Sequence, residues 1–158
     1  MITELQKQYH ATLDMFELAV NNCPDALWGR VFGDNSPFWK EAYHCVFWLY
    51  NFLGGPTKRF ELKPFGVDID PRLFKPCSTA CSKDEMQKFI ASTRTHIDGV
   101  FETLTLQDLD LPDGFRDDGG FRSVAHRLLY GLRHGQHHAG KLTAYLFATG
   151  IDYDPWRG

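Results

Sequence analysis

Three of the chain's seven histidines lie within five positions of one another, at His134, His137 and His138. If this segment is helical, residues four positions apart differ by about 40° around the axis, so His134 and His138 face the same direction. Adjacent residues diverge by about 100°, so His137 cannot point at one ion together with both of the others. We predict that His134 and His138 are metal ligands and that His137 supports them or lies on the surface. The pair His134 and His137, three positions apart, is the alternative.

Two imidazoles are too few for a stable site, so a third ligand must come from another segment, and His44 is the candidate. It lies midway along the most apolar helical segment, where an imidazole needs a partner. Considered alone it could be a hydrogen-bonded core histidine, but beside His134 and His138 we interpret it as a ligand. Glu41 lies three residues earlier on the same face. It is the candidate catalytic group, as an acceptor for a histidine N–H or a general base, and a solvated glutamate is the alternative.

Three neutral imidazoles on one divalent ion leave coordination positions open, as in catalytic rather than structural zinc sites. Such an ion can activate a water molecule, hold a thiol as its thiolate or polarise a carbonyl. The segment 123–150 contains no glutamate, which does not fit a di-iron carboxylate bundle. A mononuclear zinc or nickel site is the better match, although affinity alone does not select between metals.

Four segments with helical periodicity must position these residues. Each begins at a helix-start signal and all but the third end at a proline or glycine. They run from a capping box at Thr3-x-x-Gln6 to Asn22, from an N-cap at Ser36-Pro37 to Gly54, from a capping box at Ser82-x-x-Glu85 through Leu104, and from an N-cap at Ser123 to Gly150. No alternating strand pattern accompanies them. The sequence therefore predicts an all-α fold, a four-helix bundle that forms a single domain over residues 1–158.

Two loops interrupt this pattern. The longer one joins the second and third helices from Gly55 to Cys81, contains prolines at 56, 64, 71 and 76, and is expected to lie across one end of the bundle. A more acidic loop covers residues 106–122.

The last helix also contains glycines at 131, 135 and 140, each of which costs about 1 kcal/mol relative to alanine in a helix interior. Gly131 shares a face with His134, where a missing side chain leaves room for a ligand or for a closely packed helix. Tyr130 lies four residues before His134 and could direct its hydroxyl into the same space or pack as a core aromatic.

The charge pattern argues against several classes of partner. The formal net charge is -3, and no run of basic residues is longer than Lys58-Arg59, so we expect neither nucleic acid nor a membrane as a partner. The first residues lack the pattern of a signal peptide and no stretch approaches about 20 apolar residues, so we expect a cytoplasmic protein with reduced thiols. Cys77 and Cys81 are then ordinary loop thiols, with a disulfide or a metal pair as the alternative.

Taken together, these segments resemble the DinB/YfiT-like superfamily of four-helix bundles. The resemblance covers essentially the whole chain in helix order and loop lengths, and its motifs are PFWKEAYH at 37–44, SKDEM at 82–86 and RHGQHHAGKL at 133–142. It implies that one histidine of the second helix and an H-x-x-x-H pair of the last helix hold a divalent ion, often zinc or nickel. One departure is Lys141, where similar sequences commonly have glutamine. A cation there would discourage metal loading or attract an anionic substrate.

Characterised members of this superfamily include isomerases and S-transferases that use low-molecular-weight thiols, and the name does not imply DNA binding. We therefore expect a divalent-metal-dependent thiol S-transferase or hydrolase that acts on a small-molecule substrate, with a low-molecular-weight thiol as the candidate. A homodimer is the candidate assembly. The alternative is a non-catalytic, stress-related bundle that binds metal or a partner.

Overall fold

The computed structural model describes residues 1–32, 36–54, 63–66, 69–77, 79–115 and 120–157. Four long helices dominate the described part, which confirms the predicted all-α bundle: α1 (Ile2–Asn22), α3 (Phe38–Gly54), α4 (Lys83–Thr103) and α5 (Val124–Ala148). Three short elements join them: helix α2 (Asp25–Trp28), the antiparallel pair β1 (Val31–Phe32) and β2 (Ser36–Pro37), and a 3-10 turn η1 (Asp108–Asp110). Within the described residues, no helix has both the length and the apolar character needed to cross a bilayer.

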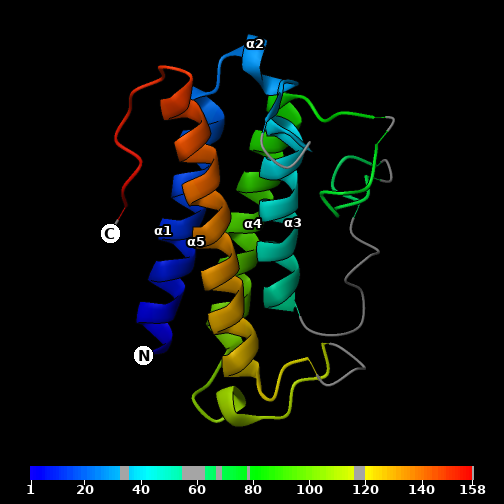
Figure 1. Cartoon of the computed structure of the whole chain (residues 1–158). Helices are drawn as coiled ribbons and strands as arrows, with labels where there is room; N and C mark the ends of the chain where they lie inside the picture. Colours follow the sequence, from blue (N-terminus) through cyan, green and yellow to red (C-terminus); the bar gives the residue numbers. More distant parts are fainter. Residues whose placement is uncertain (33–35, 55–62, 67–68, 78, 116–119, 158) are drawn as a thin grey trace.

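The order of the helices around the bundle decides which residues can meet. Helix α3 packs against α4 and α5, and α1 packs against the same two helices from the other side. Figure 1 shows this arrangement, with α5 at the front and α4 behind it. Because α3 and α5 are neighbours, side chains in the middle of α3 can reach those in the middle of α5.

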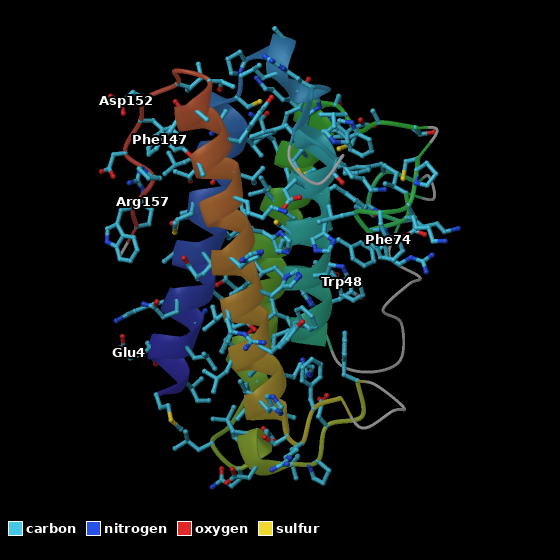
Figure 2. The ribbon with its side chains drawn as sticks, in the orientation of Figure 1. Glu4, Trp48, Phe74, Phe147, Asp152 and Arg157 are labelled. Atoms are coloured by element: carbon cyan, nitrogen blue, oxygen red, sulfur yellow. The ribbon has the colours of Figure 1, made fainter. Side chains whose placement is uncertain are left out.

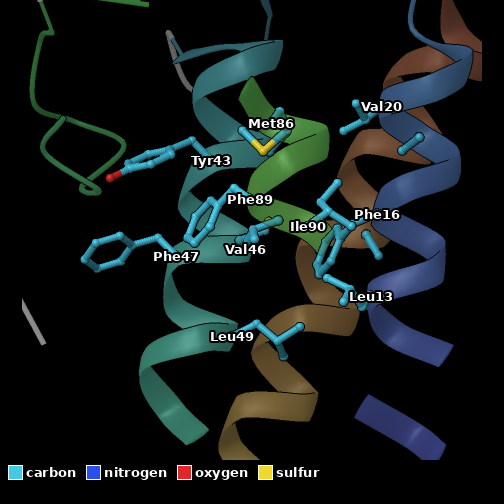
Figure 3. Close-up of a cluster of buried hydrophobic side chains, with 14 of the residues drawn as sticks. Leu13, Phe16, Val20, Tyr43, Val46, Phe47, Leu49, Met86, Phe89 and Ile90 are labelled. Carbon is cyan, nitrogen blue, oxygen red and sulfur yellow. The ribbon is translucent and has the colours of Figure 1, made fainter. Parts of the chain in front are cut away.

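Apolar side chains from the helices fill the interior of the bundle. Figure 3 shows Leu13 and Phe16 of α1 beside Leu49 of α3 and Ile90 of α4, and each of these is at most 1% exposed. Burial of one such side chain contributes about 1.5–3 kcal/mol to folding. This core fixes the helices against each other, so it also fixes the relative positions of the side chains that α3 and α5 direct toward one another.

Gly131, for which the sequence left two roles open, and Gly135 both serve helix packing. A Cβ atom at Gly131 would lie 2.7 Å from the hydroxyl of Tyr9, and one at Gly135 would lie 2.7 Å from Cγ2 of Thr12. Both separations are too short for real contacts, so α1 can approach α5 this closely only because these side chains are missing. The Tyr9 hydroxyl donates a hydrogen bond to the Leu128 carbonyl at 2.8 Å across this contact.

Helix starts follow the sequence signals at α4 and α5 but not at the other two long helices. Ser82 forms the predicted capping box with Glu85, and Ser123 caps α5 by accepting from the backbone N–H of His126. The predicted cap at Thr3 is wrong because α1 begins at Ile2, and the backbone N–H of Leu5 already donates to the Met1 carbonyl. Ser36 is not a cap either: it lies in β2, and its hydroxyl donates to the Leu73 carbonyl at 2.9 Å.

The expected position of the long loop across one end of the bundle is wrong for its described part. Residues 69–77 run along the side of α3 (Figure 1), while residues 55–62 lie outside the described residues. Three successive carbonyls of this segment accept hydrogen bonds from α3. Ile69 accepts from the Tyr43 hydroxyl at 3.1 Å, Asp70 from Lys40 Nζ at 2.6 Å, and Pro71 from His44 Nδ1 at 2.7 Å. Side chains of α3, including a histidine, thus hold the segment through its backbone.

Candidate metal centre

His44 of α3 meets His134 and His138 of α5 at the middle of the bundle. The three Nε2 atoms lie 3.2 Å from one another in every pair, and the group could hold a metal ion. We call these residues the three-histidine cluster. One helical turn separates His134 from His138, and the contact of α3 with α5 supplies the third ring. His137, by contrast, is exposed, so the structure brings together the pair at 134 and 138 rather than the pair at 134 and 137.

Two of the rings have fixed tautomers because their other nitrogen faces an oxygen that can only accept. His44 Nδ1 lies 2.7 Å from the Pro71 carbonyl, and His138 Nδ1 lies 2.5 Å from Glu41 Oε1. Each Nδ1 must therefore carry the hydrogen, which leaves a lone pair on Nε2 of the neutral ring. Lone pairs directed at one point repel each other unless a proton or a cation lies between them.

The separation of the three nitrogens also fits one ion. In a tetrahedral zinc site with Zn–N distances of about 2.0–2.1 Å, two histidine nitrogens lie about 3.4 Å apart. The 3.2 Å separations in the three-histidine cluster are close to that value. The donor set, three imidazoles, is that of catalytic zinc sites, which keep a position for water or substrate.

Glu41 lies behind His138, on the side of the ring that faces away from the cluster. Its side chain is 2% exposed, and its Oε1 accepts from both His138 Nδ1 and Lys141 Nζ, the latter at 3.0 Å. Burial acts to raise the pKa of the Glu41 carboxyl, but the hydrogen bonds from His138 and Lys141 outweigh it, and the pKa lies below its ordinary value. Glu41 is thus an ionised acceptor that orients His138. This position suits the acceptor role better than that of a general base.

Lys141 is therefore committed to Glu41 and is not among the described residues that line the substrate-sized pocket beside the cluster. Its cation balances the buried carboxylate instead of facing a bound molecule.

Burial keeps two of the rings neutral at physiological pH. Desolvation, helped by the nearby His138 ring, lowers the pKa of His44 to about 4, and the same two causes lower the pKa of His134 to about 3. Metal ligands must be deprotonated, so both rings are ready to bind without first losing a proton.

The remaining ring nitrogen of the cluster has no comparable support. His134 Nδ1 is buried and has no hydrogen-bond partner in the described part of the chain. The ring stacks on Tyr130, with centroids 6.0 Å apart, and lies edge-on to Phe52. Aromatic contacts rather than a hydrogen bond set the orientation of His134.

A pocket of about 410 Å³ opens onto the cluster at His44 and His134. Arg72 and Leu73 of the long loop form part of its wall, and Trp48 and Phe74 lie on the same side of the bundle (Figure 2). In the described part of the chain, six Phe, Trp and Tyr side chains line it: Trp48, Phe52, Phe74, Phe115, Phe121 and Tyr130. Its volume is that of a small-molecule site, and its lining favours an apolar group.

Sequence reasoning missed most of this lining. Trp48 and Phe52 follow His44 by four and eight residues, so helical spacing could have placed them on its face. The sequence allowed Tyr130 either to direct its hydroxyl toward the site or to pack as an aromatic. In the structure it lines the pocket and packs against Phe52. No sequence signal indicated the Pro71 carbonyl, because a backbone atom of a loop has no residue type.

The fold and this cluster define a class of protein, a four-helix bundle with a three-histidine site of the kind that binds metal. A sequence model of the DinB superfamily matches residues 8–142, and the chain belongs to that family. The resemblance drawn from the sequence is thereby confirmed. Searches of curated proteins and of solved structures give no match.

Proposed function

We propose that this chain is a divalent-metal-dependent enzyme, a thiol S-transferase or a hydrolase, whose ion is held by His44, His134 and His138. The observation that carries the proposal is the mutual 3.2 Å separation of the three Nε2 atoms at the wall of an aromatic pocket. Zinc and nickel are among the divalent metals that imidazole ligands suit, and they are the metals proposed here. When bound, such an ion supplies Lewis-acid chemistry that activates a thiol or a water molecule near neutral pH.

The surrounding residues prepare the site for that chemistry. The Pro71 carbonyl and the Glu41 carboxylate fix the rings of His44 and His138 with Nε2 toward the centre. The aromatic walls exclude water and contact an apolar part of the substrate. Among the described lining residues, Tyr130, which stacks on His134, is the one whose side-chain hydroxyl can hydrogen-bond to a bound molecule.

Metal content after loading with zinc or nickel and removal of excess metal tests the ligand set. We expect one ion per chain in the unmodified protein and a loss of at least tenfold in affinity for His44→Ala, His134→Ala and His138→Ala. His137→Ala is the matched control, because His137 is an exposed neighbour of His138 and should keep full metal content. Stoichiometric metal in all three ligand variants would refute the site.

An activity assay distinguishes the proposed enzyme from the alternative, a non-catalytic stress-related bundle. The metal-loaded protein should conjugate a low-molecular-weight thiol to an aromatic electrophile, or hydrolyse an aromatic ester, and His138→Ala should lose this activity. Full metal loading without turnover across a panel of thiols and esters would favour the non-catalytic bundle.

A further inference from the structure

A second cluster of reactive side chains lies one helical turn before the three-histidine cluster, around a buried lysine. Lys40 of α3 is 2% exposed. Its Nζ donates to the Asp70 carbonyl at 2.6 Å, the Lys75 carbonyl at 3.2 Å and Cys77 Sγ at 2.5 Å. An ammonium group has three N–H donors, and these acceptors occupy all of them. Two of the acceptors are backbone carbonyls and the third is the Cys77 sulfur, and the Asp70 carboxylate interacts with the same cation.

Lys40 and Cys77 are in direct contact. Nζ donates a hydrogen bond to Sγ, so the nitrogen and the sulfur are immediate neighbours. The thiolate is the nucleophilic form of cysteine. Nothing has to move far for these two atoms to become bonded.

A small reagent can reach this pair. Cys77 is half-buried, and it lines a pocket of about 430 Å³ together with Lys40, Trp39 and Lys75. This pocket is separate from the aromatic one, although Leu73 and Phe74 contribute to both.

The other three cysteines differ from Cys77 in burial and in reactivity. Cys23, Cys45 and Cys81 are at most 2% exposed. Burial raises the pKa of the Cys23 thiol to about 11 and that of Cys81 to about 12, and it holds the pKa of Cys45 well above its usual range. Thiols of this kind react slowly, so an oxidant should select Cys77.

We propose that Lys40 and Cys77 form a peroxide-sensitive modification site, in which oxidation of the sulfur is followed by a covalent bond between Lys40 Nζ and Cys77 Sγ. The site is independent of the metal centre and of the proposed enzymatic activity. It would link the first turn of α3 covalently to the loop segment 69–77.

Both steps balance with hydrogen peroxide as the oxidant. In the first, the Cys77 thiolate attacks one peroxide oxygen, the O–O bond breaks, and with one proton the products are a sulfenic acid and water; sulfur is oxidised by two electrons and the peroxide is reduced. In the second, the Lys40 ammonium first loses a proton, the lone pair of the free amine attacks the sulfur, the S–O bond breaks, and the leaving oxygen takes a second proton from Nζ and departs as water. The resulting sulfenamide contains two hydrogen atoms fewer than the lysine amine and the thiol together.

Mass spectrometry of the full chain with and without hydrogen peroxide tests the proposal. After proteolysis we expect a peptide that joins Lys40 to Cys77, lighter by about 2 Da than the sum of its two parts, and its disappearance on treatment with excess dithiol. Fragmentation of this peptide distinguishes Cys77 from Cys81. Cys77→Ser should abolish the link, and Cys81→Ala should retain it.

Lys40→Met removes the nitrogen and should instead leave a sulfenic acid on Cys77 that a dione reagent traps. If this variant does not fold, the peptide map of the unmodified protein still decides the question. Three results would overturn the proposal: no oxidation of Cys77, oxidation of Cys77 to a sulfinic acid without any link to Lys40, or preferential oxidation of a buried cysteine.

Discussion

Glu41 Oε1 lies 2.5 Å from His138 Nδ1, on the opposite side of the imidazole from the Nε2 atom that faces His44. A buried carboxylate in this place orients the ring and increases the basicity of its far nitrogen. The same oxygen accepts from Lys141, so the charge of the carboxylate is balanced from a second direction.

Replacement of Glu41 should weaken metal binding. Glu41→Gln keeps an acceptor oxygen but removes the charge, so we expect the affinity for zinc to fall by about 10–100-fold. Competition with a chromogenic chelator measures it. Glu102→Gln, an exposed change on α4, is the matched control and should leave affinity unaltered. A variant of Glu41 that loses turnover with unchanged zinc affinity would show that this residue is a base rather than a positioning residue.

Replacement of Lys141 should have the opposite effect. Lys141→Gln removes a cation whose nitrogen lies 3.0 Å from Glu41 Oε1. The negative charge of the Glu41 carboxylate is then no longer balanced from that side, so it acts more strongly on His138. We expect the zinc affinity to rise by roughly twofold to tenfold, as removal of one nearby positive charge allows. The same chelator competition reads it out, and a fall in affinity would show that Lys141 is needed to hold Glu41 in place.

Acid should destabilise the metal-free protein. The pKa of His44 falls from 6.5 to about 4 and that of His134 from 6.5 to about 3 on folding, so between these limits the unfolded chain binds protons that the folded chain does not. Stability is therefore full above pH 6.5 and is lost as the pH falls, by about 1 kcal/mol per pH unit for each histidine. Urea titrations from pH 7 to pH 5 in the presence of a chelator measure this slope. His44→Gln should reduce it, and equal stability at both pH values would contradict the burial of neutral rings.

The glycines of α5 should respond to alanine in opposite directions. Gly131→Ala and Gly135→Ala place a Cβ atom 2.7 Å from an atom of α1, so we expect each to destabilise the protein by about 1–3 kcal/mol. At Gly140 an added Cβ atom would meet nothing within 4 Å in the described part of the chain, and Gly140→Ala should stabilise the helix by about 0.5–1 kcal/mol. Urea denaturation of the three variants compares them directly, and a neutral effect at Gly135 would mean that α1 and α5 can separate without cost.

Helical spacing and burial were enough to select the three histidines that the structure brings together. His134 and His138 are placed on one face by local geometry, and His44 was conspicuous because an imidazole in an apolar helix needs a partner. The contact between α3 and α5 brings His44 to the other two histidines. No local sequence pattern predicts this contact, but neighbouring helices of a four-helix bundle form such contacts.

Other features could not be read from the sequence for identifiable reasons. The pattern at Thr3 matches a helix cap equally well when the residue lies inside the first turn, as it does here. Gly131 could have served a ligand or a neighbouring helix, since both need the same missing side chain. The partner of Lys141 depends on where Glu41 lies across the α3–α5 contact, so the charge of Lys141 alone suggested an effect on metal loading or on an anionic substrate.

The three consecutive carbonyls of Ile69, Asp70 and Pro71 impose an unusual constraint on a surface loop. Because the backbone rather than the side chains contacts Tyr43, Lys40 and His44, most substitutions in this stretch leave its polar contacts in place. Insertion or deletion of a single amino acid there would shift every carbonyl out of register with its donor and misalign the imidazole of α3. Loop length at this point is consequently as important to the site as the identity of a ligand.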